Sequence, residues 1–166
     1  MGTYDVSLRP AREVDSVPIA QLWTEAYVRA GLVPHAEPFT VRKVHDALDQ
    51  AEVFVADQEG QVVGVVVLAA HGTALASITE SSAEEQVCLL AVSAAARRSG
   101  VGRALMDVCA ARAGKRDCAA LVLWTRPPQH AAHHLYEALG YHRAPSRDCA
   151  PGGHPRLAYR LALSWT

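Results

Sequence analysis

Apolar residues recur along this chain with two periods, one typical of strands and one typical of helices. Short runs rich in Val, Leu and Ala have the length and composition of strands. They lie at residues 6–10, 53–56, 62–68, 87–92, 119–124 and 156–163, with a further candidate at 74–78. Residues 141–143 are less apolar, and we expect them to form a closing strand together with 156–163. Between them, apolar residues three or four positions apart predict helices that begin near residues 16, 40, 101 and 129.

The residues at the ends of these segments are of types that start or stop helices. Asp15 or Ser16 can cap the first helix, Gly31 can end it, and Thr40 can cap the second. Gly140 suits the position just after the last helix, because glycine adopts a positive φ without strain. These local signals agree with the periodic pattern about where the predicted helices begin and end.

The order of the elements predicts an α/β fold with a mixed sheet flanked by helices. Residues 57–61 separate two β-branched runs and are typical of a turn, which predicts an antiparallel hairpin. Residues 119–124 are apolar throughout, as in a strand that is buried on both faces in the middle of a sheet. The chain has 166 residues and no linker or internal repeat, so we expect one domain over residues 4–164.

Composition and charge indicate a soluble globular protein. Half of the residues are apolar, a fifth are charged, and the formal net charge is -1. A chain so close to neutral has no positive field that would attract nucleic acid or an anionic membrane, so we expect neither partner. No apolar run approaches the length of a membrane span, and the N-terminus lacks a charged-then-apolar leader. We therefore expect a cytoplasmic protein.

The cysteines and histidines give no sign of a disulfide framework or a metal site. Cys88 and two other cysteines lie inside apolar runs, and no Cys-x-x-Cys is present, which is typical of reduced core residues. Cys88 could in principle accept an acyl group, but its apolar neighbours favour core packing. His130 and His134 have the i,i+4 spacing of a zinc pair but lack a third ligand, so we expect a solvated helix face and no metal.

The segment between the predicted strand at 87–92 and the next helix has the properties of a phosphate-binding loop. Arg97, Arg98 and Arg103 surround two glycines at the start of a helix, where free amides and the helix dipole favour an anion. A P-loop would need Lys-Ser/Thr after the second glycine, where this chain has Arg103 and Ala104. A dinucleotide fingerprint would need a third glycine. The loop is therefore of another kind.

Two motifs in this chain resemble those of the GNAT superfamily of N-acetyltransferases. Leu90-x-Val92 followed by Arg97-x-x-Gly100-x-Gly102 is similar to its acetyl-CoA loop, with Ala94 where the family often has proline. The second motif, after the next strand, is Gln129-x-x-Ala132-x-x-x-Tyr136-Glu137-x-Leu139-Gly140-Tyr141. It resembles the family segment that flanks the pantetheine arm, with Gln129 in place of the usual Asn and Tyr141 in place of Phe. The order of elements resembles the family over nearly the full length.

The resemblance implies a GNAT acyl-CoA N-acyltransferase-like fold and acetyl-CoA as cofactor. Main-chain groups at the end of the strand would pair with pantetheine, and one amide would polarise the thioester carbonyl. Loop amides and arginines would hold the diphosphate. The implied cofactor-binding residues are Leu90, Ala91, Val92, Arg97, Arg98, Ser99, Gly100, Val101, Gly102, Arg103, Gln129 and Tyr136.

Acetyl transfer also requires a neutral amine and a proton for the leaving thiolate. A lysine-like ammonium has a pKa near 10.4, so a base or a water chain must take its proton. Family members often carry a carboxylate where this chain has Gln86. Glu85 is the predicted base, directly or through water, against the alternative of a solvated residue at the start of a strand. Tyr136 is the predicted acid, although positioning of the thioester would give the same pattern.

The sequence thus predicts an enzyme that transfers an acetyl group to a primary amine by direct attack in a ternary complex. A small-molecule acceptor is the leading hypothesis; a protein N-terminus, a lysine, or a non-catalytic acyl-CoA-binding module are the alternatives. Regions that line the acceptor pocket in similar enzymes contain Trp23, Tyr27, His35, Glu37 and His71. Because relatives are commonly dimers, a homodimer is a further expectation.

Overall fold

The computed structural model describes residues 6–32 and 38–163. The elements follow the predicted order, except that residues 74–78 form turns and no strand. The helices are α1 (Ser16–Trp23), α2 (Val41–Gln50), α3 (Val101–Lys115) and α4 (His130–Ala138), and one turn of π-helix, η2 (Thr24–Val28), extends α1. The strands are β1 (Val6–Pro10), β2 (Glu52–Gln58), β3 (Gln61–Ala70), β4 (Glu84–Val92), β5 (Ala120–Thr125), β6 (His142–Arg143) and β7 (Leu157–Ala162).

The strands of the described chain form a seven-stranded sheet in the order β1-β2-β3-β4-β5-β7-β6. β4 and β5 pair in parallel, whereas β1–β2, β2–β3, β5–β7 and β6–β7 are antiparallel. The sheet is therefore mixed, and the predicted α/β fold class is confirmed.

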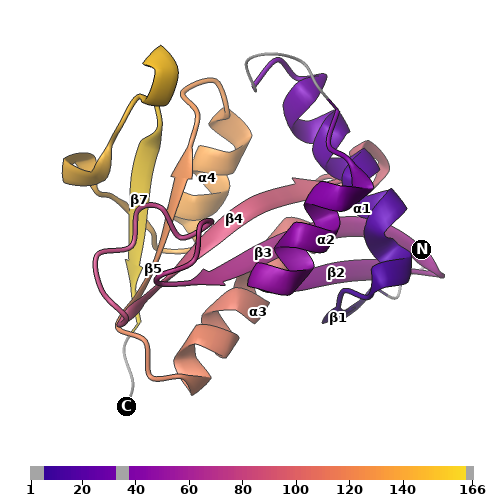
Figure 1. Ribbon diagram of the computed structural model, residues 1–166, viewed down its shortest axis with the longest axis horizontal. Coiled ribbons are helices and arrows are strands. Elements are labelled where there is room, and N and C mark those ends of the chain that lie inside the picture. Colours follow the sequence, from indigo (N-terminus) through magenta and orange to yellow (C-terminus); the bar gives the residue numbers. More distant parts are fainter. Residues whose placement is uncertain (1–5, 33–37, 164–166) are drawn as a thin grey trace. The chain divides into compact units, whose positions relative to one another are not determined.

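The elements belong to two compact units (Figure 1). Unit 1 contains the described residues of Met1–Leu68 and Leu89–Asp107, and unit 2 contains those of Ala69–Cys88 and Val108–Thr166. The C-terminal part of β4 and the first turns of α3 thus belong to unit 1. The single domain over residues 4–164 stays a prediction, and residues 4, 5 and 164 lie outside the described residues.

In unit 1, a tight hairpin joins β2 and β3, as the sequence predicts. Its two connecting residues, Glu59 and Gly60, have φ values of 53° and 84°, as the two central positions of a type I′ turn require. The Asp57 carboxylate accepts a hydrogen bond from the Gly60 amide at 2.8 Å, which closes the turn. This turn matches the twist of the strands and pairs Gln58 with Gln61, and a β-bulge between Ala56 and Asp57 shifts the register of the rest of the hairpin.

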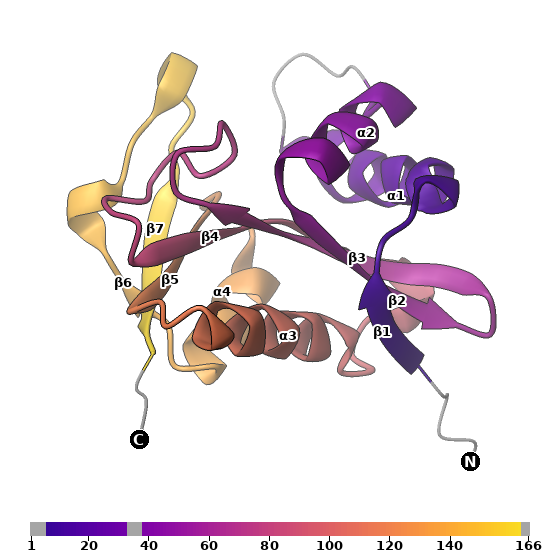
Figure 2. The ribbon, with the colours of Figure 1, turned by 60° about the horizontal axis from the view of Figure 1, so that its bottom comes forward.

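Helices cover both faces of the unit 1 strands. Figure 2 shows α1 and α2 together on one face of β1–β3. The first turns of α3 pack closely on β3, where a Cβ on Gly64 would lie 2.7 Å from Val101 Cγ1 and 3.0 Å from Leu105 Cδ1. A glycine is needed at this position because no side chain fits between the strand and the start of α3.

The N-terminus of α1 differs in detail from the predicted cap. Asp15 occupies the capping position, but its side chain makes no capping hydrogen bond. Its carboxylate instead accepts hydrogen bonds from the Arg9 guanidinium, at 2.8 and 3.0 Å, and from the Arg12 amide, at 2.7 Å. Thr40 caps α2 as predicted, because its hydroxyl accepts from the Lys43 amide at 3.2 Å.

In unit 2, three tyrosines link α4 to the strand at its side. The centroid of the Tyr136 ring, on α4, lies 5.9 Å from that of Tyr141 and 6.1 Å from that of Tyr159 on β7. All three residues are buried. α4 is followed by Gly140, whose φ of 93° confirms its predicted role in ending the helix. β5 is buried along most of its length, as its apolar composition predicts.

Candidate functional site

The loop between β4 and α3 presents unpaired backbone amides at the start of a long helix. Arg98 and Gly100 both have positive φ, 64° and 87°, which turns the chain sharply before the helix. The Ala104 amide donates to the Gly100 carbonyl at 3.0 Å, so the amides of residues 101–103 have no partner inside the helix. Partial positive charge gathers there, and an anion is the natural ligand.

Formal positive charge lies beside these amides. Arg97, Arg98 and Arg103 are exposed, and within the described chain none of them forms an ion pair with a carboxylate. A Cβ on Gly100 would meet no atom within 4 Å, so open space lies over this position. The structure therefore brings the predicted loop residues, 97–103, together in unit 1, and their role in binding an anion stays a prediction. The Ser99 hydroxyl donates to the Ala96 carbonyl and stabilises the turn.

The strand residues predicted to pair with the cofactor are held in place by two aromatic side chains that the sequence did not assign to them. Leu89, just before Leu90, has a φ of 52°, which is rare for a branched residue in a strand. Trp23 Nε1 donates to the Leu89 carbonyl at 2.9 Å, and the Tyr27 hydroxyl donates to the Leu90 carbonyl at 2.5 Å. Both rings also lie against Phe39, with centroids at 5.6 and 6.2 Å.

Trp23 and Tyr27 were predicted to lie in regions that line the acceptor pocket in similar enzymes. Their spacing of four residues places them on one helix face, and both side chains carry a hydrogen-bond donor. That combination was the available sequence signal. The sequence could not reveal the acceptors, which are carbonyls more than sixty residues away.

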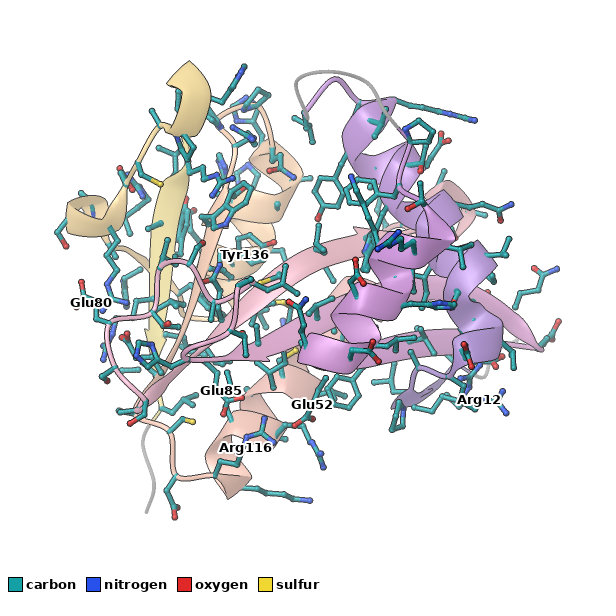
Figure 3. The ribbon with its side chains drawn as sticks, in the orientation of Figure 1. Arg12, Glu52, Glu80, Glu85, Arg116 and Tyr136 are labelled. Atoms are coloured by element: carbon teal, nitrogen blue, oxygen red, sulfur yellow. The ribbon has the colours of Figure 1, made fainter. Side chains whose placement is uncertain are left out.

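Glu85, the predicted base, is buried and held by a bidentate ion pair (Figure 3). Arg116 donates from Nε to Oε2 at 2.8 Å and from Nη2 to Oε1 at 2.7 Å, and the Cys118 thiol donates to Oε2 at 2.9 Å. Burial opposes ionisation, but these donors outweigh it and lower the pKa of Glu85 below its usual value. A carboxylate held in this way is a weak base. Its catalytic role stays a prediction, and the contacts favour a structural one.

Glu84 is also buried and forms a larger ion-pair network. Arg147 donates to its two oxygens at 2.8 Å each, Arg160 donates at 3.2 Å, and the Glu80 amide donates at 2.9 Å. Burial opposes ionisation of Glu84, yet the hydrogen bonds, led by that from Arg147, lower its pKa to about 2. Glu84 is thus ionised at neutral pH and ties three segments of unit 2 together.

Gln86 and Cys88 complete the described part of β4 in unit 2. The Gln86 carbonyl oxygen accepts from the Ile78 amide at 2.9 Å, while its buried Nε2 has no partner within the described chain. The Cys88 thiol donates to the Leu75 carbonyl at 3.3 Å, and burial raises its pKa to about 12. A thiol with so high a pKa is not ionised at neutral pH, so the preference for core packing over a nucleophilic role stands.

Tyr136 faces the interior of unit 2 beside β7 (Figure 3). Burial, followed by the proximity of Cys88 and Tyr159, raises the pKa of its phenol well above the usual value. The hydroxyl therefore carries its proton throughout the neutral range and can act as a hydrogen-bond donor. A free thiol has a pKa of about 8.5, so full proton transfer from this phenol to a thiolate is uphill in the free protein.

Gln129 lies at the N-terminus of α4, as the second motif predicts. Its side-chain oxygen accepts from the Arg126 amide at 2.8 Å and from the Thr125 hydroxyl at 3.0 Å. These bonds shape the turn after β5 and fix the orientation of the side-chain amide. Only its NH₂ group remains to contact a cofactor.

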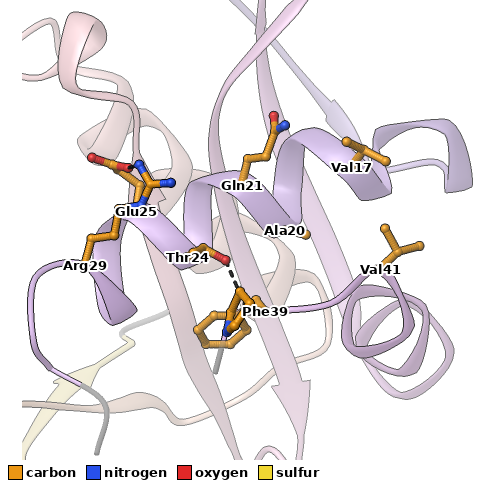
Figure 4. A pocket seen from close by; sticks show the side chains of 9 residues that line it. Val17, Ala20, Gln21, Thr24, Glu25, Arg29, Phe39 and Val41 are labelled. Atoms are coloured by element: carbon orange, nitrogen blue, oxygen red, sulfur yellow. Dashed lines mark hydrogen bonds and ion pairs between the residues drawn. The ribbon is translucent and has the colours of Figure 1, made fainter. Parts of the chain in front are cut away.

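Unit 1 also contains a pocket of about 460 Å³ beside α1 (Figure 4). None of the predicted cofactor residues lines it. A Glu25–Arg29 ion pair of 2.9 Å lies at its rim, and the Phe39 amide donates to the Thr24 hydroxyl at 3.0 Å. The residues that line it are Val17, Ala20, Gln21, Thr24, Glu25, Arg29, Pro38, Phe39 and Val41.

The remaining predicted acceptor-pocket residues have varied placements. His71 Nδ1 lies 2.7 Å from the Thr79 hydroxyl, in an exposed part of unit 2. His35 and Glu37 lie outside the described residues.

Across residues 6–32 and 38–163, no three His, Cys, Asp or Glu side chains are grouped so that they could hold a metal ion. No helix in the same ranges is long and apolar enough to cross a bilayer.

The sequence model of the Acetyltransferase (GNAT) family matches residues 17–141, which is most of the chain. The chain belongs to the GNAT acetyltransferase family. It is an acetyl-CoA-dependent N-acetyltransferase, which confirms the predicted family, the enzymatic activity and the cofactor. No curated protein matches the chain.

Solved structures share the fold at low sequence identity. An N-acetyltransferase from Staphylococcus aureus Mu50 has a TM-score of 0.78 at 18% identity, covering 96% of this chain and 99% of that one. A ribosomal-protein-alanine N-acetyltransferase from Brucella melitensis has a TM-score of 0.76 at 20% identity, covering 95% and 99%. yncA from Salmonella typhimurium, solved with its cofactor acetyl-CoA, has a TM-score of 0.74 at 15% identity, covering 97% and 95%.

The residues of the loop fit the phosphate end of acetyl-CoA. The diphosphate requires donors and positive charge, which the amides of residues 101–103 and Arg97, Arg98 and Arg103 supply. It also requires close approach to the backbone, which the open space over Gly100 permits.

Proposed function

We propose that the enzyme acetylates the primary amine of a small molecule, by direct attack within a ternary complex. Acetyl-CoA, when bound, supplies the acetyl group as an activated thioester. The observation that supports acetyl transfer from acetyl-CoA is the uncompensated cationic loop at the start of α3, in a chain of the GNAT family. In this proposal the loop binds and orients the cofactor, while main-chain donors and a small number of side chains promote acetyl transfer.

Residues 90–92 have the role of positioning the acetyl carbonyl through their main chain. Trp23 and Tyr27 support this by fixing the carbonyls of Leu89 and Leu90. Fixed donors stabilise a developing oxyanion better than mobile ones, because no reorganisation is needed at the moment of reaction. The two aromatic residues are thus positioning residues in the proposal.

Tyr136 has the role of donating a hydrogen bond from its hydroxyl to the departing sulfur. Its raised pKa supports this role, because the phenol is neutral and always carries a proton to donate. The amine must lose its own proton before it attacks, and the lowered pKa of Glu85 makes direct proton uptake by that carboxylate inefficient. Because Glu84 and Glu85 are engaged in buried ion pairs, we propose that a water chain takes the proton from the amine.

A second candidate acceptor is the N-terminus of a protein. Two of the similar structures are ribosomal-protein-alanine N-acetyltransferases, from Brucella melitensis and Escherichia coli, each at 20% identity. At this identity the likeness establishes the fold and not the acceptor, so the small-molecule proposal keeps its place. A cytoplasmic location and a homodimer also remain proposals.

The decisive experiment measures coenzyme A binding and acetyl transfer separately. Isothermal titration should give binding to the wild type and a loss of roughly tenfold or more in Arg98→Gln/Arg103→Gln, since each removes a charge-assisted contact. The matched control is Arg29→Gln, an exposed arginine of unit 1 outside the loop. Thiol release with panels of small amines and of peptides then tests the acceptor class. Turnover with peptides alone would overturn the small-molecule proposal.

A further inference from the structure

Two arginines lie against one tryptophan at the end of β5. The guanidinium carbon of Arg156 lies 4.0 Å from the centroid of the Trp124 ring, and that of Arg126 lies 5.3 Å from it. The β5–β7 ladder pairs Trp124 with Ala158 and Thr125 with Leu157. The next step of this antiparallel register places Arg126 opposite Arg156, so two positive charges meet where the ladder ends.

No carboxylate in the described chain compensates these charges. Other arginines of unit 2 are paired: Arg116 with Glu85, Arg143 with Asp148, and both Arg147 and Arg160 with Glu84. The Arg126 guanidinium, by contrast, has no carboxylate partner in the described chain and donates to the Pro155 carbonyl at 3.5 Å. Arg156 Nε is buried and has no hydrogen-bond partner in the described residues.

This arrangement is unfavourable without a ligand. A buried N–H without an acceptor loses its hydration, and two like charges at one strand end repel each other. Burial, and then the charge of Arg156, lower the pKa of Arg126. A planar anion would relieve the repulsion between the two charges, because guanidinium groups bind carboxylates through parallel hydrogen bonds.

The position of the pair connects it to the predicted chemistry of unit 2. β5 runs parallel to β4, and sites in such sheets lie beyond the carboxyl ends of the strands. The Arg126 amide is bonded to Gln129, and His133 Nε2 lies 3.1 Å from the Arg126 carbonyl. The His133 ring in turn lies 6.0 Å from Tyr159, which contacts Tyr136.

We propose that Arg126 and Arg156, stacked on Trp124, form a subsite that binds an acidic group of the acceptor amine. The substrate class is therefore an amine that also carries a carboxylate. This inference rests on the proposed acetylation of amines and narrows its substrate class. The same chemistry is offered by a small amino acid and by a peptide with an acidic residue next to its N-terminus.

The test compares acceptors that differ only in the charge of one group. β-Alanine is paired with β-alaninamide, and the peptide Ala-Asp-Ala-Ala-amide with Ala-Asn-Ala-Ala-amide. We expect kcat/KM to be roughly 10- to 100-fold higher for the acidic member of one pair, as a charged hydrogen bond predicts. A preference within the β-alanine pair identifies the acceptor as a small amino acid, and one within the peptide pair identifies it as a peptide. The preference should disappear in Arg126→Gln/Arg156→Gln and weaken in Arg156→Lys, which keeps the charge without the planar fork.

Arg143→Gln is the matched control. This arginine also lies over an aromatic ring, 5.4 Å from the centroid of Tyr159, but is paired with Asp148. It should leave the acidic preference unchanged. Equal kcat/KM within each pair for the wild type would overturn the proposal. So would a double variant that lost coenzyme A affinity while keeping its acceptor preference, because the arginines would then serve a cofactor phosphate.

A binding measurement separates this proposal from the proposed function. Succinate carries carboxylates and no amine, so it reports on the subsite without acetyl transfer. It should quench the fluorescence of Trp124 in the wild type, but not in Arg126→Gln/Arg156→Gln, and Trp124→Phe identifies the signal. Arginine-dependent quenching in an enzyme that acetylates no amine would reject the proposed function and support the subsite. If the enzyme acetylated amines but showed neither quenching by succinate nor a preference for acidic acceptors, the proposed function would be supported and the subsite rejected.

Discussion

The indole Nε1–H of Trp23 donates a 2.9 Å hydrogen bond to the carbonyl oxygen of Leu89. This bond joins α1 to the residue of β4 that has a φ of 52°. A left-handed conformation costs a branched residue free energy and persists only where the surroundings impose it. Trp23 is buried and supplies part of that constraint. Leu89 directly precedes residues 90–92, which are predicted to pair with pantetheine.

Replacing Trp23 by Phe should loosen this part of β4. The substitution keeps an aromatic ring but leaves the Leu89 carbonyl without its donor, so we expect a loss of about 1–3 kcal/mol in the free energy of unfolding. Coenzyme A affinity should fall with it. Urea denaturation and calorimetric titration measure the two effects. Gln21→Ala, an exposed change on the same helix, is the control. Unchanged affinity at reduced stability would remove Trp23 from the positioning role.

Gly100 should be required for cofactor binding beyond the cost of its backbone conformation. Gly100 and Gly60 have φ values of 87° and 84°, and a Cβ on either would meet nothing within 4 Å. Each Gly→Ala change should therefore cost a similar free energy of unfolding, about 1–2 kcal/mol. Only Gly100→Ala should weaken coenzyme A binding, by roughly tenfold, because its methyl group would occupy the space open to the diphosphate. If Gly100→Ala and Gly60→Ala bound coenzyme A with equal affinity, the diphosphate would not lie over Gly100.

Glu84 should make the stability of the enzyme sensitive to acid. Its pKa is about 2 in the folded protein and 4.5 in the reference state, so the folded state binds fewer protons between these values. Its contribution is complete above about pH 4.5 and is lost as the pH falls toward 2. Glu84→Gln should cost roughly 3 kcal/mol at pH 7, since it leaves Arg147 without its buried partner.

Urea unfolding of the wild type and Glu84→Gln at pH 7 and pH 3 tests this expectation. The difference in stability between the two proteins should shrink at pH 3, because Glu84 binds a proton in the unfolded state there while it stays mostly ionised in the folded state. Arg143→Gln, which removes an ion pair at a more exposed site, serves for comparison. A constant difference across this range would show that the contribution of Glu84 does not depend on its charge.

Glu85 can be tested as a base against its ion-pair partner. If its role is structural, Glu85→Gln and Arg116→Gln should both lower the unfolding free energy by about 1–3 kcal/mol and leave kcat/KM within a few fold. This is the result that the contacts with Arg116 and Cys118 favour. A general base would instead give a loss of about 100-fold or more in Glu85→Gln alone. Steady-state kinetics at a temperature where all variants are folded distinguishes the two.

Tyr136→Phe should lower kcat while preserving coenzyme A affinity. The hydroxyl is the only group removed, and the ring contacts with Tyr141 and Tyr159 are retained. A hydrogen bond to the departing sulfur predicts a loss of roughly 10- to 100-fold in kcat, whereas proton transfer predicts a loss of about 100-fold or more. Unchanged turnover would exclude both roles.

The sequence by itself determined the elements and the loop that we propose binds the diphosphate. The hairpin turn at Glu59–Gly60, the cap at Thr40 and the helix end at Gly140 are set by residues within a few positions of each other. The same is true of residues 97–103, where the arginines, the glycines and the helix start are neighbours in the chain. Local signals of this kind can be read without knowledge of the packing.

Only the tertiary structure decided which distant groups meet. Glu85 had the residue type of a base, but Arg116 and Cys118, more than thirty positions away, engage it. Trp23 and Tyr27 meet β4 carbonyls, and Arg126 and Arg156 converge on Trp124, only because of the order and register of the strands. Burial and long-range partners set the charge state of a side chain, and neither is encoded in its immediate neighbours.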